Sequence, residues 1–217
     1  MSSREKILSA VAANQPAPRE LPPLPSAAPA AESAQGSAMP ADLDAQFIAV
    51  LESIGGEAYT VSGFARIGTI LHEKFPAAKR VISNCPQIQP FAEAASASED
   101  PHTFDDVDLA ILPAHFGVAE NGACWITESQ MLHRALPFIT QHLALVIHRR
   151  DIVADMHQAY DRIALLESAV APYGFATFIA GPSKTADIEQ SLVLGAHGPI
   201  SLTVFLLDEQ LSDAGFF

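Results

Sequence analysis

From Ala41 onward the chain alternates short apolar runs with longer segments of helical periodicity, and this alternation restricts the fold more than any other feature. The run Leu143–Ile147 is apolar throughout, which is typical of a strand buried on both faces of a parallel sheet. Strands that alternate with helices imply a mainly parallel sheet covered on both faces. The sequence therefore predicts an open α/β domain over residues 41–217.

The expected elements are short, and glycine or proline marks several of their ends. Helices are expected at Leu43–Ile54, Phe64–Phe75, Leu132–Ile139, Ile152–Ser168 and Thr185–Leu194, and the segment Ala114–Val118 also has a helical pattern. Strands are expected at Glu57–Val61, Arg80–Ser83, Val107–Leu112, Ala123–Thr127, Leu143–Ile147, Phe175–Ala180 and Ile200–Leu206. Gly55 and Gly56 provide a C-cap for the first of these helices, and Pro76 stops the second.

The N-terminal part of the chain has a different composition. Residues 1–13 form a short segment in which Ile7, Leu8 and Val11 are spaced for an amphipathic helix. Residues 14–40 hold seven of the sixteen prolines, mixed with alanine and serine, and such a segment is expected to be an extended linker. The helix could dock on its own domain, on a second copy of the chain or on another protein, and the sequence does not decide among these. It also leaves open whether the chain forms a homo-oligomer.

Charge and cysteine content exclude several classes of protein. The formal net charge of −13 leaves no basic surface for nucleic acid, and no apolar run approaches the length of a membrane span. The two cysteines, Cys85 and Cys124, cannot supply a four-thiolate iron–sulfur cluster, and the eight histidines show no metal-ligand spacing. We therefore expect a cytoplasmic protein without membrane insertion, with no metal site and no cofactor in this chain.

Gly181, Pro182, Ser183, Lys184 and Thr185, here called the lysine segment, follow an expected strand and begin an expected helix. Backbone amides at such a helix N-terminus favour an anion, and Lys184 is the only Lys or Arg after Ile163. A small carboxylate or phosphate is the ligand that this pattern predicts, with Asp187 orienting the lysine. The alternative is a helix capped by Ser183 with an exposed lysine.

A second candidate is the glutamate turn, residues Ala119, Glu120, Asn121 and Gly122. Glu120 could act as a nucleophile, and Asn121 and Gly122 could bind a ligand, while the alternative is a solvated turn. His197 stands near the end of the expected helix Thr185–Leu194, where it either caps that helix or contacts a ligand or a partner.

Both candidates resemble a known family. The stretch GPSKTADIEQSLVLGAHGP and the upstream GVAENG resemble two signatures of the LUD domain, the lactate utilization protein C family, and SREKIL resembles its leading helix. This resemblance implies the open α/β fold shared with sugar-phosphate isomerases and CoA transferases. The segment Glu120–Gly122 is also similar to the glutamate motif of family I CoA transferases.

The resemblance implies a non-redox subunit of a cytosolic system that oxidises L-lactate to pyruvate together with iron–sulfur partner proteins. Whether the chain is an enzyme is left open. The alternatives are a stand-alone catalyst of the CoA-transferase or sugar-phosphate isomerase type, which would use Glu120 and Lys184, and a regulatory module that binds a small anion.

Overall fold

The chain divides into two units, Met1–Ala38 and Met39–Phe217. A computed structural model describes residues 2–16, 40–88, 91–93, 100–169, 174–188 and 191–208. In the first unit, helix α1 spans Ser3–Ala13 and begins with a capping box between Ser2 and Glu5. The expected helix is therefore present, whereas most of the expected linker at residues 14–40 lies outside the described residues.

The second unit is built on a five-stranded parallel sheet with the order β1-β11-β6-β3-β2. These strands are β1 (Glu57–Val61), β2 (Val81–Ser83), β3 (Leu109–Pro113), β6 (His142–His148) and β11 (Ser201–Leu207). Strand β6 lies in the middle and pairs with β11 on one side and with β3 on the other. Its residues from Leu143 to His148 are buried, so the expectation of a buried parallel strand and of an α/β fold is confirmed.

A second, smaller sheet covers part of one face and was not expected from the sequence. Its order is β7-β4-β5-β8, with β7 at Ile152–Val153, β4 at Phe116–Val118, β5 at Ala123–Thr127 and β8 at Ala176–Ile179. Strand β4 replaces the helix that was predicted at Ala114–Val118, and it pairs antiparallel with β5 and parallel with β7. A segment of this length is too short for periodicity to separate helix from strand, and here the two neighbouring strands decide.

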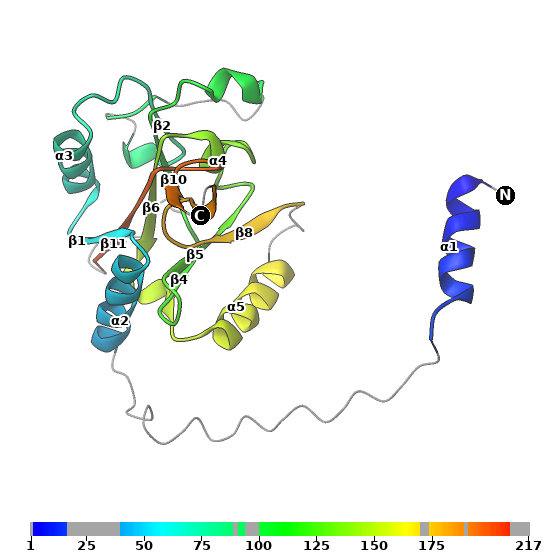
Figure 1. The fold of residues 1–217 in the computed structure, drawn as a ribbon. Helices are drawn as coiled ribbons and strands as arrows, with labels where there is room; N and C mark the ends of the chain where they lie inside the picture. Colours follow the sequence, from blue (N-terminus) through cyan, green and yellow to red (C-terminus); the bar gives the residue numbers. More distant parts are fainter. Residues whose placement is uncertain are drawn as a thin grey trace. The chain divides into compact units, whose positions relative to one another are not determined.

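The helices and sheets form layers around three apolar clusters (Figure 1). Helix α3 (Phe64–Lys74) packs on one face of the parallel sheet, and helix α2 (Pro40–Ser53) and the smaller sheet pack on the other. Helix α5 (Met156–Ala169) lies on the outer side of the smaller sheet, where Ala159 and Ile163 meet Phe116 and Trp125. Short helical turns complete the chain at α4 (Leu136–Ile139), η1 (Pro86–Ile88), η2 (Pro101–Phe104) and η3 (Arg149–Asp151).

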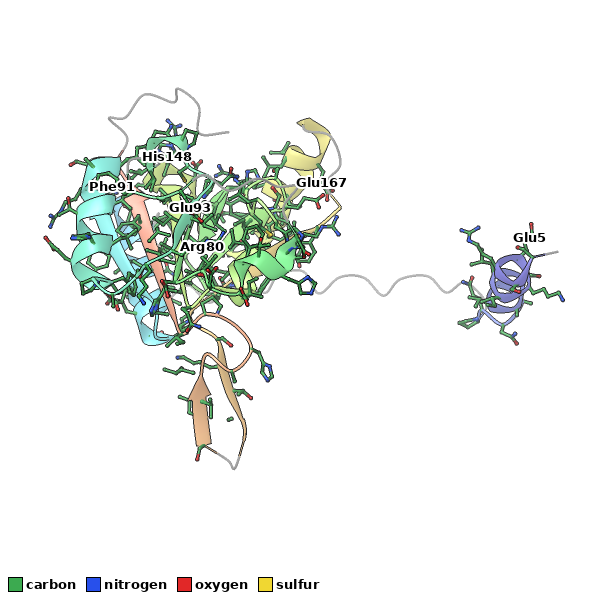
Figure 2. The ribbon with its side chains drawn as sticks, turned by 90° about the horizontal axis from the view of Figure 1, so that it is seen from above. Glu5, Arg80, Phe91, Glu93, His148 and Glu167 are labelled. Atoms are coloured by element: carbon green, nitrogen blue, oxygen red, sulfur yellow. The ribbon has the colours of Figure 1, made fainter. Side chains whose placement is uncertain are left out.

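The prediction of a helix at Thr185–Leu194 is wrong. Strands β9 (Lys184–Ile188) and β10 (Ser191–Leu194) pair antiparallel there, with Lys184 opposite Leu194 and Thr185 opposite Val193. This hairpin belongs to neither sheet, and it projects from the body as the pale orange pair of strands in Figure 2. None of the helices in the described part of the chain has the length and apolar content that a bilayer span requires.

Candidate functional site

The glutamate turn connects β4 to β5 and reaches the beginning of α5. Glu120 is exposed, and its Oε2 accepts a hydrogen bond of 2.9 Å from the backbone N–H of Met156, the first residue of α5. The backbone N–H of Glu120 donates to the Ala154 carbonyl at 3.0 Å. A carboxylate at a helix N-terminus satisfies a free amide and interacts favourably with the helix dipole. The structure therefore makes Glu120 a second acceptor at the start of α5, 36 residues later in the sequence, beside Asp155, whose carboxylate accepts from the Gln158 amide.

The other two residues of the glutamate turn hold its shape. The Asn121 side chain accepts a hydrogen bond from the Ala123 amide at 3.0 Å through Oδ1, and its Nδ2 donates to the Met156 sulfur at 3.2 Å. Gly122 has a φ of +67°, and a Cβ atom at this position would lie 3.0 Å from the backbone N and Cα of Leu51 in α2. Only glycine combines this conformation with so close an approach to the helix.

The lysine segment packs against the end of the same helix. Gly181 has a φ of +68°, and a Cβ atom there would lie 3.0 Å from the carbonyl oxygen of Ile54. The Lys184 ammonium donates a hydrogen bond to that carbonyl. Since α2 has no basic residue in its own last turn, Lys184 provides the cation that favours a helix C-terminus, from a position 130 residues away.

The geometry that was predicted for an anion site is therefore absent from the lysine segment. Ser183 does not cap a helix: its N–H donates to the Pro199 carbonyl at 2.9 Å, and its carbonyl accepts from Gly195 at 3.0 Å. Pro182 is buried, and Thr185 is part of β9. The helical pattern expected over Thr185–Leu194 is overridden by the antiparallel pairing of β9 with β10.

The remaining predicted residues lie on or beside the hairpin. Asp187 is in β9, and its side chain is outside the described part of the structure, so its expected contact with Lys184 stays a prediction. His197 is exposed in the bend between β10 and β11, rather than at a helix end. A ligand-binding role for either residue also stays a prediction.

The glutamate turn and the lysine segment thus meet at one place, the last turn of α2, and this was not expected. That place lies at the amino ends of the parallel strands, because α2 leads directly into the start of β1. The connection from the hairpin to β11 lies at the same edge, where the Ile200 amide donates to the Gln141 carbonyl, next to the start of β6. The lysine segment follows the end of strand β8, as predicted, but β8 belongs to the smaller sheet and not to the parallel sheet.

The carboxyl ends of the parallel strands carry polar groups that sequence reasoning missed. The His115 Nε2 lies 3.1 Å from Thr127 Oγ1, which lies 3.0 Å from Ser129 Oγ, and Asn84 donates to the Ser129 carbonyl at 3.1 Å. Burial, followed by the charge of Arg162, lowers the pKa of His115 to about 4, so its imidazole is neutral at pH 7. Thr127 is only 2% exposed, which favours a structural network over a reactive hydroxyl. The position of His115 directly after an apolar strand is the signal that could have identified it.

A polar hollow of about 560 Å³ opens at the amino ends of the parallel strands, next to the end of α3. It is lined by Lys74, Phe75, Pro76, Ala77, Ala78, Asp108, Gln141 and His142. Lys74 Nζ lies 2.5 Å from Glu57 Oε2, and the His142 Nδ1 lies 2.8 Å from Ser201 Oγ. Burial, and then the charge of Lys74, lowers the pKa of His142. The carboxylate of Glu57 neutralises the charge of Lys74, and the imidazole of His142 is neutral. The hollow therefore has no net positive charge that would attract an anion.

Residues 70–207 match the LUD domain family. A lactate utilization protein C from Bacillus pumilus is 31% identical over 117 residues, which cover 54% of this chain and 49% of that protein. A lactate utilization protein C from Shouchella clausii is 30% identical over 118 residues, covering 54% and 48%. The chain thus spans about half the length of these curated relatives.

The fold has a counterpart among solved structures. The crystal structure of a DUF162 family protein from Deinococcus radiodurans superimposes with a TM-score of 0.60 at 18% identity. The superposition covers 78% of this chain and 99% of that one. At this identity the likeness supports the fold alone.

Proposed function

We propose that this chain, which belongs to the LUD domain family, takes part in lactate utilization as a cytoplasmic subunit without a redox centre of its own. The observation that carries the proposal is the match of residues 70–207 to this family, together with relatives that bear the name lactate utilization protein C. The reaction to which the subunit contributes is the oxidation of L-lactate to pyruvate.

The two cysteines support a role for partner proteins in electron transfer. Cys85 is 2% exposed and Cys124 is fully buried, and burial raises the pKa of each thiol to about 12. A thiol of this kind stays protonated, whereas a cluster ligand must be a thiolate, and a four-thiolate cluster needs more cysteines than the chain has. We therefore assign the electron-carrying clusters to iron–sulfur partner proteins.

The contacts of Glu120 and Lys184 weigh against a stand-alone enzyme of the CoA-transferase or isomerase type. Glu120 accepts a hydrogen bond from the start of α5, and Lys184 donates one to the end of α2. Both groups thereby stabilise helix ends that the fold requires. Binding of a small carboxylate or phosphate near Ser183 stays a prediction, because the Ser183 amide and the Lys184 ammonium both already donate to carbonyl groups of the chain.

The test combines genetics with purified protein. A strain that lacks the gene should fail to grow on L-lactate and grow normally on glucose, and both the wild-type chain and Glu120→Gln should restore growth. The purified full-length chain should not reduce an artificial electron acceptor with L-lactate, and activity should appear when cysteine-rich proteins encoded by neighbouring genes are added. Lactate oxidation by the chain alone, or normal growth of the deletion strain on lactate, would contradict the proposal.

A further inference from the structure

A cavity of about 510 Å³ lies between α3 and the edge of the parallel sheet that β2 and β3 form. It shares no lining residue with the glutamate turn or the lysine segment. The β3 residues Leu109 and Ile111 line it and are only 2% and 1% exposed. The floor of the cavity is therefore formed by side chains of the apolar core.

One wall of the cavity is the ring of Phe91. The close approach of this ring to α3 depends on Gly68, because a Cβ atom there would lie 2.6 Å from the ring. Phe91 is nevertheless 48% exposed, so a large aromatic surface remains in contact with water. Covering such a surface with an apolar ligand is favourable by the hydrophobic effect.

The segment that carries Phe91 is held in place from β2. The Glu93 amide donates to the Val81 carbonyl at 2.8 Å, and the Glu93 carbonyl accepts from Ser83 at 3.1 Å. The guanidinium of Arg80 binds the Glu93 carboxylate at 2.7 Å and also contacts Asp106. Arg80, Glu93 and Phe91 are labelled in Figure 2, on the same side of the molecule. These contacts fix the Phe91 wall before any ligand arrives.

The charges around the cavity select against an anionic ligand. The polar lining residues come from one exposed side of α3 and are Thr69, His72 and Glu73. The Glu73 carboxylate and the net charge of −13 both repel anions, and a charged group of either sign would lose its hydration on the apolar floor. The volume falls within the range that is usual for small-molecule sites.

We propose that this cavity binds an uncharged, largely apolar small molecule that packs on the Phe91 ring and on the floor formed by Leu109 and Ile111. The site is separate from the residues used for the proposed function, so either proposal can fail without the other.

The experiment uses two fluorescent probes with the same ring system in titrations of the full-length chain. N-Phenyl-1-naphthylamine is uncharged, and 1-anilinonaphthalene-8-sulfonate carries a sulfonate. The uncharged probe should bind saturably at one site per chain with the higher affinity. Non-saturable binding, or tighter binding of the sulfonate, would overturn the proposal.

Two tryptophan variants on the same helix locate the site. Thr69→Trp places a large side chain at the cavity mouth, and Ala65→Trp introduces the same side chain at an exposed α3 position outside the lining. Thr69→Trp should weaken binding of the uncharged probe by about tenfold or more, because the ring competes for the buried surface. Ala65→Trp should bind as the wild type does. Equal affinity in the two variants would refute the assignment to this cavity.

Discussion

The close contact between Gly122 and α2 makes a quantitative prediction for Gly122→Ala. Alanine in the left-handed conformation costs about 1–2 kcal/mol. The new Cβ atom would also lie 3.0 Å from the backbone N and Cα of Leu51, and separating a packed turn from a helix adds about 1–3 kcal/mol. We expect a loss of about 2–5 kcal/mol in the free energy of unfolding, which lowers Tm by roughly 4–20 °C in a domain of this size.

The cost of the contact with Leu51 and the cost of the left-handed backbone conformation can be measured separately. Gly122→Asn keeps the close Cβ contact but tolerates a positive φ better, so it should recover only part of the loss, about 1 kcal/mol. Gly174→Ala is the matched control, because its φ is not in the left-handed region and its nearest neighbour is the flexible end of Arg134. The control should change stability by about 1 kcal/mol or less.

Urea unfolding monitored by Trp125 measures these differences. Trp125 is the only tryptophan, is 9% exposed and packs against Phe116 and Phe178, so its emission reports the folded core. Stability of Gly122→Ala within about 0.5 kcal/mol of wild type would refute the reasoning, since that is the scale of an ordinary surface substitution. Full recovery in Gly122→Asn would show that the contact with Leu51 carries no cost.

Three further predictions concern the polar residues. Lys184→Met should lower the free energy of unfolding by about 0.5–1 kcal/mol, because it removes the cation from the end of α2. Lys184→Arg should retain most of this stabilisation, and urea titration measures both variants. Glu120→Gln should cost about 0.5 kcal/mol and Glu120→Ala about 1 kcal/mol in the same assay, because the amide still accepts a hydrogen bond from α5. The folded-state pKa of His115, about 4, lies below its ordinary value of 6.5, so the contribution of His115 to stability should be fully present above pH 6.5 and be lost as the pH drops toward 4. His115→Gln should flatten this pH dependence; an unchanged slope would exclude His115 as its source.

Much of the parallel sheet could be predicted because its strands are apolar runs that can be read from neighbouring residues in the sequence. Glu57–Val61 was predicted with its observed bounds, and the predicted strand Leu143–Ile147 differs from β6 by one residue at each end. The smaller sheet was not recognised as a sheet, since β7 has two residues and β4 has three, too few for a periodic pattern. The region Thr185–Leu194 contains good helix formers, and intrinsic propensity is a weak guide when tertiary pairing competes with it.

The sequence by itself determined the α/β class, the buried central strand β6, the glycine end of α2 and the segments that mark the family. The end of α2 illustrates this, because Gly55 has a φ of +87° and the amides of Gly55 and Gly56 close the last turn onto Glu52 and Leu51. Such features depend on neighbours along the chain, so local spacing is sufficient to predict them.

Only the tertiary structure decided what the charged residues of those segments do. Lys184 was expected to face an anion at a helix N-terminus, and it instead lies at the C-terminus of α2, 130 residues away in sequence. Glu120 likewise meets the start of α5, 36 residues away. A helix end attracts a charge of opposite sign whichever part of the chain supplies it, so the partner is set by which segments packing brings together, and that information is not contained in any local pattern.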